Sequence, residues 1–202
     1  MAFNFANNTQ AITWTQKNLS RPPITLFATY RPTTNSVRGI LIGYNTNVPY
    51  ASLEYRADFI GDPLVFDCRP NAAIVSTTSS TLNAYQSVAG TRWGLPAAEG
   101  SIYLNGSLDS TIIGNSTALS YIVNLTLGQS GSVGDLADIS AWNVALTGAE
   151  IASLAKGFSP RRIRPQSLVF YAPLLRNLQD LRQGLALTAV NSPTVANHPR
   201  VY

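Results

Sequence analysis

The ten carboxylates of the chain raise the question of whether any two could work as a catalytic pair. A glycoside hydrolase needs two carboxylates about 5–10 Å apart across the scissile bond. Glu54 and Asp58 would share one face of a strand, but four residues of extended chain separate them by about 13 Å. Because that distance is too long for a retaining pair, we interpret both acids, with Arg56 between them, as part of a solvated strand face.

The single histidine and the single cysteine do not indicate a nucleophilic site. A Ser-His-Asp triad would have to use His198, which lies near the end of the sequence, and no Gly-x-Ser-x-Gly motif is present. Cys68 ends an apolar run and fits a small core or strand residue better than a nucleophile. We therefore predict no catalytic residues and a protein that is not an enzyme.

A metal site is indicated only by scattered acids. Asp135 with Asp138, or Asp62 with Asp67, could contribute oxygens to Ca²⁺, which takes about 6–8 oxygen ligands. No dense oxygen cluster surrounds either pair, and a lone cysteine excludes a multi-cysteine zinc site. We predict no metal and no cofactor, and keep Ca²⁺ as the alternative.

Aromatic residues among polar ones suggest a second kind of chemistry. Tyr44, Tyr50, Tyr55 and Trp93 are candidates for stacking on a glycan, because exposed rings on a concave sheet can pack against sugars. Neighbouring amides and hydroxyls would then supply hydrogen bonds. The same four residues could equally pack in the core or across strands, so both interpretations stay open.

The composition predicts that strands position these residues. The chain has 202 residues, enough for one domain with a small appendage, and 45% of them are hydrophobic. Only 12% are charged, against about 25% in ordinary globular proteins, which argues against disorder and against a helical bundle. No run approaches the roughly 20 apolar residues of a membrane span, and the first residues show no secretory signal.

Short apolar runs recur between turn signals at a spacing typical of a β-sandwich or barrel. We predict strands at 11–15, 24–30, 37–44, 50–59, 64–68, 73–77, 85–93, 101–104, 111–113, 121–127, 134–142, 167–172 and 185–190. Asn105-Gly106 predicts a type I′ turn. Thr147-Gly-Ala-Glu150 is a capping box that predicts one short helix, which Gly157 would end. The stretch 159–165 is expected to be an extended connector because Pro160 and Pro165 both disfavour a helical conformation in the residue before them.

Positive charge is concentrated in the last fifth of the chain. Residues 161–202 hold six arginines and one acid, a net +5, whereas residues 1–160 carry a net −1. These arginines could simply solvate a connector, or they could dock the segment on an acidic protein surface. The docking candidates are Arg161, Arg162, Arg164, Arg176 and Arg182. Nucleic-acid binding is not predicted, because the run lacks interleaved aromatics and a high lysine density.

Five segments carry a family resemblance through their order. They are Phe3-Asn-Phe-Ala-Asn-Asn-Thr-Gln-Ala-Ile, Ile24-Thr-Leu-Phe-Ala-Thr-Tyr-Arg-Pro32, Tyr85-Gln-Ser-Val-Ala-Gly90, Ser101-Ile-Tyr-Leu-Asn-Gly-Ser107 and Gly134 to Ile151. Together they resemble the laminin G-like, concanavalin A-like jelly-roll family. The family's usual Trp-His-His is Tyr85-Gln-Ser87 here, and its common acid after Ile-Ala is Asp138. The calcium ligands of family members are therefore not carried over.

The resemblance implies an all-β, two-sheet antiparallel jelly-roll sandwich (concanavalin A-like) with one short helix. It covers residues 1–157, leaving 158–202 as a basic C-terminal arm. Within the arm, Ser167-Leu-Val-Phe-Tyr-Ala-Pro-Leu resembles the strand that normally begins such a domain. We therefore expect strand 167–172 to complete the sandwich, as in a circularly permuted domain.

Two functions remain open. The domain together with its Ser-Pro-x-x-Ile-Arg-Pro connector resembles virion proteins of tailed bacteriophages, which implies a structural protein such as a capsid decoration or cement protein. Its partners would be capsid proteins or other copies of itself in a homo-oligomer, assembled in the host cytoplasm, with no nucleic acid and no membrane. The alternative is a carbohydrate-binding, lectin-like module for attachment to a host or glycan, because the fold implies binding without fixing the ligand.

Overall fold

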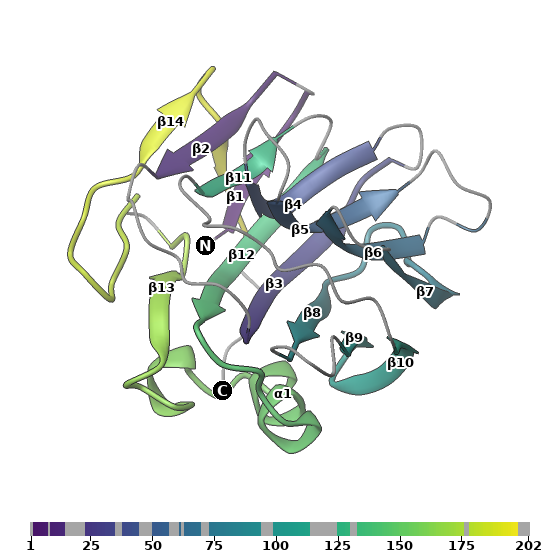
Figure 1. The fold of residues 1–202 in the computed structure, drawn as a ribbon. Helices are drawn as coiled ribbons and strands as arrows, with labels where there is room; N and C mark the ends of the chain where they lie inside the picture. Colours follow the sequence, from purple (N-terminus) through teal and green to yellow (C-terminus); the bar gives the residue numbers. More distant parts are fainter. Residues whose placement is uncertain are drawn as a thin grey trace.

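The computed structural model describes residues 2–7, 9–14, 23–34, 38–44, 50–56, 61, 63–69, 73–93, 99–113, 125–129, 133–175 and 178–197. They form two antiparallel sheets packed face to face, with one α-helix at one end (Figure 1). The predicted all-β sandwich with one helix is confirmed.

The eight-stranded sheet has the order β10 (Ser107–Ile112), β9 (Gly100–Leu104), β8 (Gln86–Arg92), β3 (Ile24–Pro32), β12 (Gly134–Trp142), β1 (Ala2–Phe5) and β15 (Thr194–Ala196), with β13 (Leu168–Ala172) also paired to β12. The seven-stranded sheet has the order β14 (Thr188–Val190), β2 (Ala11–Trp14), β11 (Leu125–Gln129), β4 (Arg38–Tyr44), β5 (Tyr50–Arg56), β6 (Pro63–Arg69) and β7 (Ile74–Ser79). The helices are α1 (Gly148–Ala155) and the 3₁₀ turn η1 (Pro160–Arg162).

The core lies between the sheets, where alternate side chains of each strand meet. Leu53 of β5, Phe66 of β6, Leu136 of β12 and Phe170 of β13 are among its buried members. The sheets approach closely at Gly90, where an added Cβ would lie 2.3 Å from the Phe66 ring. A larger residue there would have to push the sheets apart.

The C-terminal segment adds strands to both sheets. β13 pairs with β12 through Ile139↔Ala172, beside the stretch of β12 that pairs with β1. β14 adds to β2 and β15 adds to β1, so this segment forms an edge of each sheet. The predicted strand at 167–172 therefore joins the sandwich, while circular permutation stays a prediction.

One local prediction for this segment was wrong, and one of its strands was not predicted. The connector at 159–165 is not fully extended, because Ser159 caps the turn η1 by accepting a hydrogen bond from the Arg161 amide. No strand was predicted after residue 190, yet Thr194–Ala196 forms β15. A left-handed turn at Asn191 and Ser192 makes this possible, since it leads the chain from β14 directly into β15.

Helix α1 packs on the outer face of the eight-stranded sheet. Its capping box is formed as predicted: Thr147 Oγ1 accepts from the Glu150 amide, and the Glu150 carboxylate accepts from the Thr147 amide. Ile151 and Leu154 face a second apolar cluster that includes Trp142. No helix in the described part of the chain is long and apolar enough to span a bilayer.

Candidate functional site: a pocket on the outer face of the eight-stranded sheet

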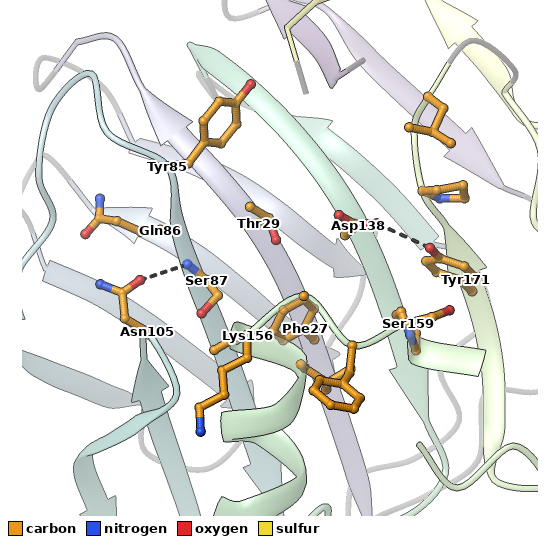
Figure 2. A pocket seen from close by; sticks show the side chains of 17 residues that line it. Phe27, Thr29, Tyr85, Gln86, Ser87, Asn105, Asp138, Lys156, Ser159 and Tyr171 are labelled. Carbon is orange, nitrogen blue, oxygen red and sulfur yellow. Dashed lines mark hydrogen bonds between the residues drawn. The ribbon is translucent and has the colours of Figure 1, made fainter. Parts of the chain in front are cut away.

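A pocket of about 490 Å³ opens on the outer face of the eight-stranded sheet, next to α1 (Figure 2). Strands β3, β8 and β12 form its floor, the chain from Leu154 to Pro160 forms one wall, and Tyr171, Pro173 and Leu175 form the other. Its volume falls within the range of about 300–1,000 Å³ typical of small-molecule sites.

Asp138 supplies the carboxylate of the pocket. It lies at a β-bulge, where the pairing of β12 with β3 shifts between Ala137 and Ser140, and its φ of 47° is left-handed. Asp adopts this conformation more readily than most residues, and bulges often redirect a side chain toward a site. The bulge places Asp138 in the pocket lining between core residues Leu136 and Ile139.

Tyr171 of β13 holds that carboxylate in place. Its hydroxyl donates to Asp138 Oδ1 at 3.3 Å, as the dashed line in Figure 2 marks. Burial, together with the negative charge of Asp138, raises the pKa of Tyr171 far above its usual value. The hydroxyl therefore stays protonated and acts as a donor at any physiological pH.

Asn105 reaches the pocket from the turn between β9 and β10. Its φ of 50° and the φ of 81° at Gly106 confirm the predicted turn with two left-handed residues. Asn105 Oδ1 accepts from the Ser87 amide at 3.0 Å, which orients the side-chain NH₂ group. An added Cβ on Gly106 would lie 2.9 Å from Ala155 Cβ, so the turn packs directly on α1.

The pocket also has an apolar side. Phe27 is buried beneath it, whereas Phe158, just past α1, is 52% exposed. Leu175 on the opposite wall is also exposed. Uncharged polar groups complete the lining at Thr29 and Ser87. The pocket thus combines exposed apolar surface with hydroxyl, amide and carboxylate groups.

Tyr85 stands at one end of the pocket, fixed by a charged network. Its ring lies 5.5 Å from the Arg31 guanidinium, and its hydroxyl donates to Asp135 Oδ2 at 3.3 Å. Asp135 is buried and also accepts from Arg31 Nε and Asn4 Nδ2, each at 2.7 Å. Burial and the Asp135 charge raise the pKa of Tyr85 well above its usual range.

The possible calcium ligands are not brought together. The Asp135 carboxylate already accepts a hydrogen bond from the Arg31 guanidinium, and the Asp138 carboxylate accepts one from the Tyr171 hydroxyl. Asp67 is buried on the other sheet, and Asp62 lies outside the described residues. Among the residues that the structure describes, no three His, Cys, Asp or Glu side chains are grouped so as to hold a metal ion.

Tyr55 and Trp93, the two predicted stacking residues whose side chains the structure describes, are not among the residues that line this pocket. Of the two interpretations left open for Tyr55, stacking on a glycan is wrong and packing in the core is right: the residue is 1% exposed, and its ring faces the core, 5.9 Å from the Tyr30 ring. Trp93 is partly buried and follows β8. Tyr44 and Tyr50 lie in β4 and β5, but their side chains are outside the described part of the structure.

The structure describes four of the five predicted docking arginines, two with a partner in the protein and two that are exposed. Arg164 pairs with Glu150 at 2.5 Å, and Arg182 donates to the Leu168 carbonyl at 2.8 Å. Arg161 and Arg162 are exposed. Arg176 lies outside the described residues.

The interpretation of Glu54 as part of a solvated strand face was wrong. Glu54 is 0% exposed, accepts from Ser52 Oγ at 2.6 Å and lies 3.5 Å from Arg56 Nη1. The alternation of β5 correctly turns Glu54 away from the core, but that side of the sheet is covered. Asp58 lies outside the described residues.

Some pocket residues were visible in the sequence, although as a family signature and not as a site. Tyr85-Gln86-Ser87 and Asp138 are the positions where the sequence departs from the family's usual residues, and Asn105 begins the predicted turn. Thr29 and Phe158 gave no signal, since nothing local distinguishes them from other strand and loop residues.

Comparison with protein-family models shows which superfamily the chain belongs to. Residues 6–152 match a laminin G-type family model described as the Concanavalin A-like lectin/glucanases superfamily. Because the match spans most of the chain, this protein belongs to that superfamily. No curated protein matches its sequence.

Solved structures show the same fold at low sequence identity. A heptameric SAP-like pentraxin from Limulus polyphemus has a TM-score of 0.63 at 15% identity, with 94% of each chain covered. A candidate carbohydrate-binding protein from Bacteroides ovatus has a TM-score of 0.69 at 16% identity, covering 97% of this chain and 61% of that one. The CBM40 of a Ruminococcus gnavus sialidase, bound to α2,3-sialyllactose, has a TM-score of 0.59 at 11% identity, covering 76% and 96%.

The family match stops short of part of the pocket. It ends at residue 152, whereas the wall from Leu154 to Pro160 and the wall of Tyr171, Pro173 and Leu175 lie beyond it. The sandwich common to the family supplies the floor, and the segment that follows supplies both walls. The site is therefore a feature of this chain that family membership alone does not provide.

Proposed function

We propose that this protein is a non-catalytic glycan-binding module and that the pocket beside α1 is its binding site. The pocket itself carries the proposal, because its lining combines exposed apolar surface at Phe158 with polar groups at Thr29, Asn105 and Asp138. A sugar ring has the complementary character, with C–H groups on its faces and hydroxyl groups around its edge. Aromatic side chains pack against the faces, while amides and carboxylates bind the hydroxyls.

The chemistry of each group suits this ligand. Asp138 can accept hydrogen bonds from sugar hydroxyls while Tyr171 holds it in place. The Asn105 NH₂ group is oriented by the bond to the Ser87 amide and can donate. Because bulge, turn and strand positions fix these groups beforehand, little conformational entropy would be lost on binding. The lectin-like fold of the family supports the same function.

A glycan array with the full chain tests the proposal. Binding to at least one saccharide is expected, and it should weaken in Phe158→Ala and in Asp138→Asn. Val195→Ala is the matched control, since Val195 is equally exposed but lies on β15 away from the pocket lining. Wild-type protein that binds no saccharide on the array, or pocket variants that bind as wild type does, would refute the assignment.

The role as a bacteriophage virion protein stays a prediction, together with its capsid partners, its homo-oligomeric state and its assembly in a host cytoplasm. It rests on the resemblance of the sequence, which the comparisons leave untested. A decoration protein could also bind glycans, so the two functions are compatible.

A further inference from the structure

The described cations around the pocket include some with a partner in the protein and some without one. Arg164 is neutralised by Glu150, and Arg182 is bound to a backbone carbonyl. Lys156, Arg161 and Arg162 are exposed, and the ion pairs of the described residues include none of the three. Lys156 lies on the wall that closes the pocket, and Arg161 directly follows Pro160, the last residue of that wall. The two cations therefore lie on either side of the exposed Phe158 in the sequence.

Both cations are placed to act on a bound molecule. Lys156 lines the pocket and extends on the same side as Asn105 (Figure 2). Arg161 follows Pro160, which lines the pocket, and its positive charge acts on the Tyr171 hydroxyl, partly offsetting the rise in the pKa of that group. Asp138 is the single acidic side chain among the described lining residues, and it is already hydrogen-bonded to Tyr171.

We infer that the pocket selects an acidic saccharide, a sugar ring that carries a carboxylate or a sulfate. In this arrangement the ring packs against Phe158, its hydroxyls reach Asn105 and Asp138, and its anionic substituent is held by Lys156 and Arg161. The inference rests on the proposed function and goes beyond it, because a neutral sugar would leave both cations without a partner. Charge-assisted hydrogen bonds are about twice as strong as neutral ones, so the substituent would dominate selectivity.

Matched saccharides test this choice. Methyl glucoside and methyl galactoside are compared with their C6-carboxylate and 6-O-sulfate counterparts by NMR titration of the full chain. We expect at least one acidic form to bind about tenfold more tightly than its neutral parent, with a preference that weakens as salt is added. The double variant Lys156→Gln/Arg161→Gln should bind both forms equally, whereas Arg182→Gln, which removes one charge elsewhere, should keep the preference.

Each other result has a distinct meaning. Equal binding of neutral and acidic sugars by the wild type overturns the acidic selectivity but leaves the glycan-binding function standing. Binding of none of the sugars overturns the inference here, and an array that is also silent overturns the function itself. A preference that survives in the double variant overturns the assignment of Lys156 and Arg161. Sodium sulfate that competes as well as the sulfated sugar binds overturns the selection of a saccharide, because the sugar ring would then add nothing to binding.

Discussion

Acidic side chains that point away from the core have different surroundings at two places in the molecule, an open pocket at Asp138 and a covered sheet face at Glu54. On the eight-stranded sheet, Asp138 lines an open pocket. On the seven-stranded sheet, Ser52, Glu54 and Asp67 are only 1%, 0% and 2% exposed, although all three lie on the side of their strands away from the core. Strand alternation therefore determines which side chains leave the core, but not whether solvent or a ligand can reach them.

The described residues show why the outer face of the eight-stranded sheet is open at Asp138. Helix α1 covers only part of the eight-stranded sheet, because its short apolar stripe contacts Phe27, Tyr103 and Trp142 and ends at Leu154. Beyond the helix, the bulge at Asp138 and the loop at Phe158 leave a hollow over the remaining strands. On this face a ligand can replace the missing cover, whereas at Glu54 the protein supplies the partners itself.

The largest expected effect is a loss of stability when Glu54, on the covered face of the seven-stranded sheet, is replaced. Glu54→Ala removes the acceptor of the Ser52 hydroxyl and leaves the Arg56 charge, on a side chain only 13% exposed, without this partner. Removing one member of a buried ion pair costs about 3–5 kcal/mol, so we expect the free energy of unfolding to fall by that amount. Urea unfolding measures it, and Glu54→Gln separates the loss of charge from the loss of volume. A change below about 1 kcal/mol would mean that this face is solvated after all.

The second prediction concerns the open face. Asp138→Asn removes the charge but keeps a residue that accepts a left-handed φ. We expect binding of the tightest array saccharide to weaken about tenfold, because a charge-assisted hydrogen bond becomes a neutral one. Calorimetric titration measures the affinity, and urea unfolding should show a stability change of under about 1 kcal/mol. Destabilisation as large as that of Glu54→Ala would remove the distinction between the two faces.

The third prediction concerns helix α1, which covers part of the eight-stranded sheet. Thr147→Ala removes the N-cap acceptor of α1, which should lower the free energy of unfolding by about 1 kcal/mol. Ser153→Ala is the matched control, because the Ser153 hydroxyl donates to the Ala149 carbonyl within the helix and caps nothing. Thermal unfolding followed by circular dichroism compares the two variants, and equal losses would show that the cap is not what holds the helix.

The sequence was most informative where one residue type has one conformational use. The capping box at Thr147, the turn at Asn105 and the strand 167–172 follow from such local rules, and the structure contains all three. The short strand β15 was missed because its pairing with β1 joins opposite ends of the chain. No local pattern reveals that kind of contact.

The site was harder to predict for the same reason. Tyr55 and Glu54 are adjacent in one strand, and their types suggested stacking and solvation, yet the core buries the first and a covered sheet face buries the second. Asp138 and Tyr171 meet only because β13 pairs with β12 across a bulge. Residue type indicates what a side chain can do, whereas the pairing of distant strands decides which side chains act together.

The smallest expected effect is a pH dependence of the free energy of unfolding, which arises from Glu150 in the first turn of α1. Burial alone would raise the pKa of Glu150, but the hydrogen bonds from Arg164 and Thr147 outweigh it and hold that pKa below its ordinary value of 4.5. A carboxyl with a depressed folded-state pKa stabilises the protein above the unfolded-state pKa, and this contribution is lost as the pH falls through the folded-state pKa.

Because the ion pair of Glu150 with Arg164 is partly exposed, Glu150→Gln should lower the free energy of unfolding by under about 1 kcal/mol at pH 7. Urea unfolding should show the gap between wild type and variant closing below pH 4.5, as the carboxyl takes up its proton. A gap that stays constant down to pH 2 would show that the charge of Glu150 contributes nothing and that the neutral capping hydrogen bonds carry the whole effect.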